Sequence, residues 1–226
     1  MPQRTSQVDA DADPRADFYA LLARLLLSAP SAALLAALGA AGPIVAAGEF
    51  ALEQAWLQLT RDAAAADAAA VAVEFALLFA DSDADSDADS DADSDADTGP
   101  PRLAPSARFY PDPGADDAAP ARLRADLAGL GLARAPHAGA LEDHLGMLCR
   151  AMALLAGAAQ PSPAAQKRFF ETWLRPWYAA CLSDIAAAGG AVFYRSVAVF
   201  ADAFLSIDAQ AFALLDGDAG AAASGE

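Results

Sequence analysis

The chain has 226 residues, which is enough for one sizeable domain or two small ones. It carries 31 acidic and 14 basic residues, and the net charge of -17 disfavours a nucleic-acid partner and suits a partner that brings arginines or lysines. Two cysteines, both in apolar helical patterns, are too few for a disulfide scaffold or a zinc site. We therefore expect a reducing compartment, no metal and no cofactor.

Residues 14–80 read as an N-terminal helical part, preceded by a polar segment, residues 1–13, that is unlike a signal peptide. No stretch shows a sustained alternation of β-branched residues, so the predicted fold class is all-α. The uncharged run at residues 25–48 is interrupted by proline and glycine and is not expected to cross a membrane. The expected helices run from Asp13-Pro14 to Pro30, from Ser31 to Gly39, from about Glu49 to Asp62, and from Asp67 onward.

An acidic repeat occupies residues 81–97, where aspartate alternates with serine or alanine. Its like charges repel and it has no large apolar side chain, so an extended, solvated loop is expected. Specific calcium binding is disfavoured because the repeat lacks the glycine turn and the terminal bidentate acid of a calcium loop. This repeat and the proline-rich stretch after it form one loop region, residues 81–119, in which residues 105–110 are expected to dock onto a helix face.

Residues 120–215 are predicted to form the C-terminal helical part, and residues 216–226 a flexible tail. A short helix is expected over residues 122–132. Ser162 is expected to cap a further helix that kinks or breaks at Pro176. The last helix has a strong apolar stripe formed by Phe193, Val197, Phe200 and Phe204.

A central helix is expected over residues 141–156, LEDHLGMLCRAMALLA. On a helical wheel, Asp143 lies near Arg150 on the polar face, and His144 lies at the edge of the apolar stripe. Acids in a first helical turn complement the helix dipole, and an edge histidine is usually a rim residue of the core. These residues alone therefore leave the function open. The apolar stripe comprises Leu141, Leu145, Leu148, Met152 and Leu155.

Several segments, in order along the chain, resemble one protein family. Besides LEDHLG, they are DFYALLARLLLSAP, VEFALLFAD, PPRLAPSARFYPDPG, FFETWLRPWYAAC and AVFYRSVAVFADAFL. Together they resemble the TorD-like family of cytoplasmic chaperones, which mature molybdenum-containing redox enzymes. The similarity covers roughly residues 17–205.

The resemblance implies a compact all-α bundle of about eight to ten helices with no catalytic chemistry of its own. Such a chaperone binds the twin-arginine signal peptide of a molybdenum-containing oxidoreductase subunit, and it can also contact the apo-form. It holds this client in the cytoplasm for cofactor insertion before export. Clients in the family include formate dehydrogenases, N- and S-oxide reductases and nitrate reductases. The resemblance fits either a monomer or a homodimer, without stable insertion into a membrane.

The same resemblance assigns peptide recognition to Glu142, Asp143 and His144. Tyr110 and Trp177 also match motif positions, although core packing explains a tryptophan at helical spacing at least as well. Glu74 is either an interior partner or a ligand contact.

The chemistry of a twin-arginine peptide favours the same region. Two guanidinium groups followed by an apolar segment need carboxylates beside a helix-lined apolar groove, which is expected at residues 143–145. One alternative is a helical assembly scaffold without peptide binding. Another is a hydrolase in which His144 works with Asp143 or Glu142 as a general acid–base pair. The hydrolase is disfavoured because the sequence shows no nucleophile elbow, phosphate loop or metal-ligand set.

Overall fold

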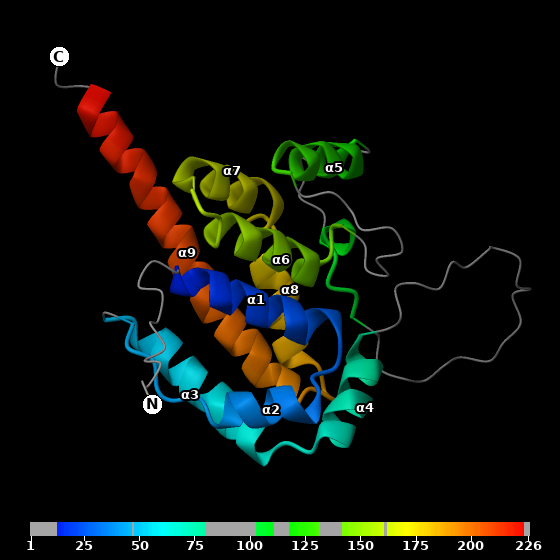
Figure 1. Ribbon diagram of the computed structural model, residues 1–226. Coiled ribbons are helices and arrows are strands. Elements are labelled where there is room, and N and C mark those ends of the chain that lie inside the picture. Colours follow the sequence, from blue (N-terminus) through cyan, green and yellow to red (C-terminus); the bar gives the residue numbers. More distant parts are fainter. Residues whose placement is uncertain are drawn as a thin grey trace, which may run out of the picture.

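A computed structural model describes residues 13–46, 48–79, 103–110, 118–131, 142–160 and 162–223, with side chains described as far as residue 215. Within these ranges the chain forms nine α-helices and one 3-10 helix, and its only β-pairings are isolated bridges, which confirms the predicted all-α class. The predicted acidic loop, residues 81–97, lies outside the described residues. The helices (Figure 1) are α1 (Pro14–Leu27), α2 (Ala32–Gly39), α3 (Phe50–Ala65), α4 (Ala68–Leu78), η1 (Ala107–Phe109), α5 (Ala119–Gly129), α6 (Leu145–Ala156), α7 (Pro163–Trp173), α8 (Tyr178–Ala187) and α9 (Phe193–Ala223).

Four helices begin after the capping residues that the sequence predicts. In each case the side chain of the capping residue accepts a hydrogen bond from a backbone N–H of the first turn. The capping residues of α1, α2, α4 and α7 are Asp13, Ser31, Asp67 and Ser162, respectively. Each bond satisfies an N–H that has no partner within its own helix. The four donor–acceptor distances are 2.9, 3.2, 2.9 and 3.3 Å.

Other helix boundaries both confirm and correct the sequence predictions. The predicted break at Pro176 is confirmed, since α7 ends at Trp173 and α8 begins at Tyr178. The helix predicted over residues 122–132 instead occupies Ala119–Gly129. The last helix runs on to Ala223, past the end predicted near residue 216, in a stretch rich in alanine, the strongest helix former.

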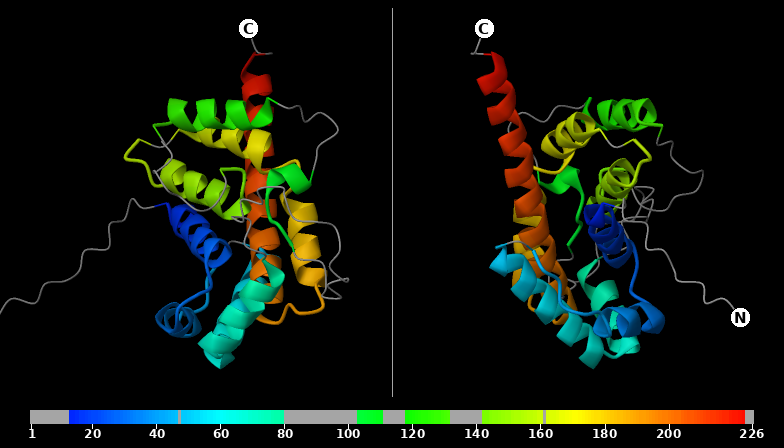
Figure 2. Two further views of the ribbon diagram at one scale, coloured as in Figure 1. Left: turned by 90° about the vertical axis from the view of Figure 1, so that its right-hand side faces the viewer. Right: turned by 60° about the vertical axis from the view of Figure 1, so that its left-hand side comes forward.

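The bundle is organised around α9. Figures 1 and 2 show this long helix running through the molecule, with α3 and α8 packed along it and α1 crossing it. The predicted stripe is confirmed, because Phe193, Val197, Phe200 and Phe204 are all buried. By length and composition, Phe193–Leu215 could also cross a membrane, but the buried core helix of a soluble protein passes the same test. Its packing inside the bundle explains its apolar character without a membrane.

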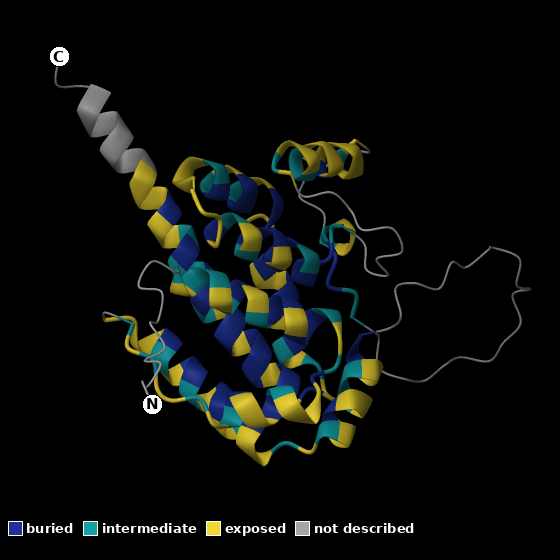
Figure 3. Cartoon of the chain, viewed as in Figure 1, coloured by how far each residue is buried: buried dark blue, intermediate teal, exposed yellow. Residues whose placement is uncertain are grey.

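The start of α6 is fixed by a close approach to α1. Leu145 and Leu148 are buried, and Figure 3 shows the buried faces of α1 and α6 turned towards the core. A Cβ atom placed on Gly146 would lie 2.7 Å from Cγ of Leu27, closer than real Cβ atoms come to their neighbours. Glycine at this position therefore lets the two helices touch, which fixes the residues just before α6 against the bundle.

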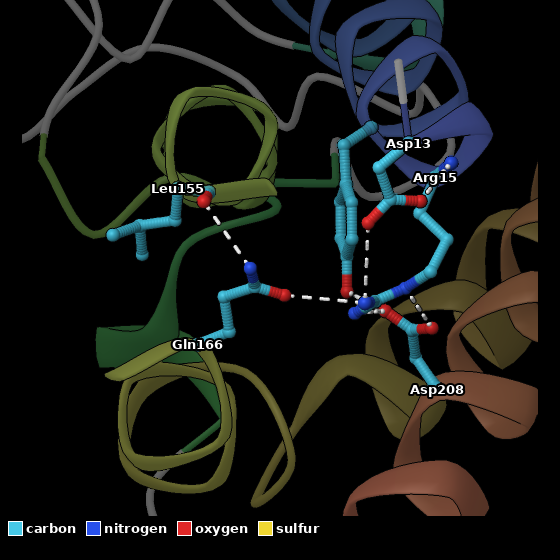
Figure 4. A network of polar contacts seen from close by, with 6 residues as sticks. Asp13, Arg15, Leu155, Gln166 and Asp208 are labelled. Atoms are coloured by element: carbon cyan, nitrogen blue, oxygen red, sulfur yellow. Dashed lines mark hydrogen bonds and ion pairs between the residues drawn. The ribbon is translucent and has the colours of Figure 1, made fainter. Parts of the chain in front are cut away.

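A buried polar network joins α1, α6, α7 and α9 (Figure 4). Arg15 donates from Nε and Nη2 to the two carboxylate oxygens of Asp208, each at 2.8 Å, and Tyr19 donates its hydroxyl hydrogen to Asp208 at 2.6 Å. Gln166 accepts from Arg15 at 3.1 Å and donates to the carbonyl of Leu155 at 3.2 Å. The network fixes the relative positions of four helices, including α6.

Candidate functional site

The candidate site forms where an extended segment meets the start of α6. The backbone N–H of Leu145 donates to the carbonyl of Pro105 at 2.7 Å, and that of Ala107 donates to the carbonyl of Asp143 at 3.1 Å. These bonds form an isolated antiparallel bridge between Ser106 and His144. Residues 105–110 therefore dock back onto the bundle as predicted, but the backbone bonds of residues 105 and 107 go to the residues that lead into α6 and not to a helix face.

The two acidic residues of the motif precede the helix instead of forming its first turn. α6 begins at Leu145, so the prediction of a helix over residues 141–156 is wrong at its N-terminal end. The helical-wheel prediction for Asp143 is wrong for the same reason, because this side chain binds Arg108 and not Arg150. Glu142 and Asp143 lie in a turn, and His144, which follows them, has an extended backbone and leads into α6.

Each carboxylate of the motif binds an arginine from elsewhere in the chain. Asp143 accepts from Nη2 of Arg108 at 2.8 Å and from Nε at 3.1 Å, which is a bidentate contact. Glu142 accepts from Nε of Arg124, on α5, at 2.8 Å. Neither arginine was predicted as a site residue, and they lie 35 and 18 positions before their partners. Nothing in the sequence pattern pairs them with the motif.

His144 caps α6. Its Nδ1 accepts a hydrogen bond from the backbone N–H of Gly146 at 3.0 Å, and the residue is 8% exposed. Burial lowers the pKa of His144 to about 4, and the nearby negative charge of Asp143 opposes this shift only in part. The histidine is therefore neutral at neutral pH, and the capping bond requires the neutral ring because Nδ1 must offer a lone pair.

Protonation of His144 is expected to destabilise the fold. The folded-state pKa of about 4 lies below the ordinary value of about 6.5, so the unfolded chain binds the proton more readily between these values, and this contribution to stability falls as the pH falls. We expect this residue to account for a loss of about 1–2 kcal/mol between pH 7 and pH 5. His144→Asn keeps a capping oxygen and cannot titrate, so urea unfolding of this variant should lack that part of the pH dependence. An identical pH dependence in both proteins would contradict the assignment.

Tyr110 and Trp177 lie together beside the motif. Their rings stack, with centroids 5.7 Å apart and planes at 21°. The hydroxyl of Tyr110 donates to Asp184 on α8 at 3.1 Å, and burial raises the pKa of that hydroxyl. Trp177 is buried and donates from Nε1 to the carbonyl of Trp173. Trp177 thus packs in the core, and Tyr110 joins the end of η1 to Trp177 and to α8.

Glu74 is an interior partner of α9. Its carboxylate accepts backbone N–H bonds from Val192, Phe193 and Tyr194 at 2.8, 3.0 and 2.7 Å. These bonds satisfy N–H groups at the start of a helix, where a negative charge also complements the helix dipole. The bonds go to the first two residues of α9 and to the residue before it, and none of the three goes to residues 142–144, so the structure does not bring Glu74 together with the motif.

The apolar groove expected at residues 143–145 is not formed by Leu145, which is fully buried. A groove of about 530 Å³ instead runs between α8 and α9, with Glu49 and Ala51 at its α3 side. The exposed apolar side chain next to the motif is Phe109, which is 58% exposed and follows Arg108 directly. Ser106 is buried beside it, and its hydroxyl has no hydrogen-bond partner among the described residues.

The comparisons with known proteins agree with the architecture. The family model described as nitrate reductase delta subunit matches residues 46–183, more than half of the chain and the part that contains the motif, η1 and α5 to α7. Neither the curated proteins nor the solved structures include a match. The chain therefore belongs to the nitrate reductase delta subunit family, a TorD-like family of chaperones for the maturation of molybdenum-containing redox enzymes.

Proposed function

We propose that this chaperone binds the twin-arginine signal peptide of a molybdenum-containing oxidoreductase subunit and retains the precursor in the cytoplasm until its cofactor is inserted. The proposed binding surface consists of residues 108–110, residues 142–144 and Arg124 on α5. We call it the motif surface. The client is an oxidoreductase of the nitrate reductase, formate dehydrogenase or N-/S-oxide reductase type.

The observation that carries the proposal is that both motif carboxylates already bind guanidinium groups. Glu142 and Asp143 are adjacent in the chain, and each accepts a charge-assisted hydrogen bond of 2.8 Å from an arginine. Two adjacent arginines of a signal peptide carry the same two groups, so the carboxylates suit them in charge and as hydrogen-bond acceptors. The exposed ring of Phe109 offers an apolar contact for the segment that follows the arginines.

The same contacts disfavour the hydrolase alternative. Nδ1 of His144 is occupied by the capping bond, and both carboxylates bind arginines. Among the described residues, no hydrogen bond joins Glu142 or Asp143 to the His144 ring, so the acid–base pair that such an enzyme requires is not assembled.

The net charge of -17 favours encounter with a basic peptide, as a peptide chaperone requires.

Three synthetic peptides test the proposal. A peptide with adjacent arginines and an apolar segment should bind the full chain in calorimetry, and replacing both arginines by glutamine should weaken binding about three- to thirtyfold, as expected for two partly exposed ion pairs. A peptide with two lysines keeps the charge but lacks the planar fork of arginine, so it should bind with intermediate affinity. Equal affinities for the arginine and glutamine peptides would overturn the proposal.

A further inference from the structure

We propose that Arg108 and Arg124 are built-in competitors of the peptide, which occupy the motif carboxylates in the free chaperone and are displaced by the two arginines of the client. This inference rests on the proposed function and concerns the regulation of the same surface. It explains why both carboxylates carry arginines of the chain itself.

The two internal pairs resemble the contacts expected of a bound twin-arginine sequence. Arg108 makes a bidentate contact with Asp143, and its own backbone N–H also donates to that carboxylate at 3.3 Å. Arg124 contacts Glu142 through Nε alone. The two arginines come from η1 and α5, yet they meet carboxylates of consecutive residues. Arginines of the chain itself thus occupy both carboxylates of the motif.

The arginines are more exposed than the carboxylates, which favours replacement of the arginines by those of a peptide while the carboxylates stay in place. Arg108 and Arg124 are 48% and 59% exposed, while Asp143 and Glu142 are 19% and 12% exposed. The carboxylates are therefore mostly buried in the protein surface, and the guanidinium groups cover them from the solvent. Ion pairs between exposed groups contribute little to stability, so their arginines can be replaced by others at small cost.

Neither arginine is needed to hold its own element in place. Segment 105–107 is fixed by backbone bonds to residues 143 and 145, which do not involve the side chain of Arg108. α5 lies at the outer edge of the bundle in Figures 1 and 2, and contacts that do not involve Arg124 hold it there. Leu123 is buried, and Asp126 accepts a hydrogen bond from Nε1 of Trp173 at 2.8 Å. Displaced arginines would thus stay tethered beside the site, where they would compete at high local concentration.

Such competition makes binding selective. The binding free energy of a peptide is the difference between its own contacts and the internal ion pairs that it replaces. A peptide with a single arginine or a loosely placed cation therefore gains little binding free energy. Adjacent arginines replace both internal pairs together. The internal arginines therefore lower the affinity for all basic peptides and favour those in which two guanidinium groups are adjacent.

Removal of one internal arginine provides the test. In calorimetry with the full chain and the synthetic twin-arginine peptide, Arg108→Gln and Arg124→Gln should each raise the affinity about two- to fivefold, the worth of one exposed ion pair. Arg61→Gln is the matched control, because it removes the same charge from the exposed face of α3 and should leave the affinity unchanged. Arg108→Lys keeps the charge without the bidentate contact and should give a smaller increase than Arg108→Gln.

A second pair of variants distinguishes competition for the carboxylates from a general effect of the changed net charge on peptide binding. In a Glu142→Gln chain the partner of Arg124 is neutral, so adding Arg124→Gln should have no further effect on affinity. Circular dichroism and thermal melts identify any variant that fails to fold. If the wild-type chain binds the peptide and neither Arg→Gln variant raises the affinity above Arg61→Gln, the competition is refuted while the proposed function stands. If no folded variant binds the twin-arginine peptide, the proposed function fails and the competition fails with it.

Discussion

Asp208→Ala is expected to lower the free energy of unfolding by about 3 kcal/mol, through the loss of a buried ion pair. Asp208 is 2% exposed and accepts hydrogen bonds from Arg15 and Tyr19. Without the carboxylate, the Tyr19 hydroxyl loses its acceptor in the core, and Arg15 keeps Gln166 and Asp13 but loses its two shortest bonds. The expected loss lies at the lower end of the range for broken buried pairs, because the Arg15 side chain keeps 31% of its surface exposed and can regain water there.

Urea unfolding of the full chain measures this loss. Asp202→Ala is the matched control, since Asp202 lies on the same helix but is exposed, and its removal should change stability by less than about 0.5 kcal/mol. Equal stabilities of the two variants would show that the network in Figure 4 contributes nothing beyond a surface charge. Peptide binding should be unaffected in both variants, because neither residue belongs to the motif surface.

Leu148→Ala is expected to cost about 2–5 kcal/mol, from lost burial and the cavity left behind. Leu148 is 1% exposed on the face of α6 that packs into the core. Asp143 lies two residues before the first residue of α6, and Asp143→Asn should stay within about 0.5 kcal/mol of the wild type, because its ion pair with Arg108 is partly exposed. Thermal melts and peptide titrations on the same preparations compare the two effects.

If the motif surface is a recognition element, binding loss and stability loss should separate between these variants. Asp143→Asn should weaken peptide binding and keep the fold, while Leu148→Ala should mainly weaken the fold. His144→Ala should lie between them, at about 1 kcal/mol, because the structure shows a buried helix cap where the sequence predicted a rim residue. An Asp143→Asn chain as unstable as Leu148→Ala would identify the pair with Arg108 as structural.

Local signals predicted most of the architecture. Asp13, Ser31, Asp67 and Ser162 cap the helices that the sequence assigns to them, and the chain breaks at Pro176. These features depend on a few neighbouring residues, whose side-chain oxygens and fixed proline ring act over one helical turn. The family resemblance is also confirmed, since the family model matches residues 46–183. It could be recognised from the sequence because several such segments follow one another in the same order.

The geometry of the site could not be predicted in this way. The start of α6 depends on His144, whose ring nitrogen acts as the cap, and on backbone bonds to residues 105 and 107. The arginines that bind Glu142 and Asp143 come from α5 and η1, and only the tertiary fold brings them to the motif. Helical periodicity carries no information on such long-range pairs, so it wrongly placed Asp143 next to Arg150.

A double-mutant cycle between peptide and chaperone tests the central claim most directly. Calorimetry should compare the arginine and glutamine peptides on the wild-type chain and on the Glu142→Gln/Asp143→Asn chain, after circular dichroism has shown that both are folded. The account predicts that the arginine-to-glutamine change weakens binding about three- to thirtyfold on the wild type and less than about twofold on the double variant, since the ion pairs are then already absent. The same penalty on both chains would show that the peptide arginines bind elsewhere, and would contradict the assignment of the motif surface.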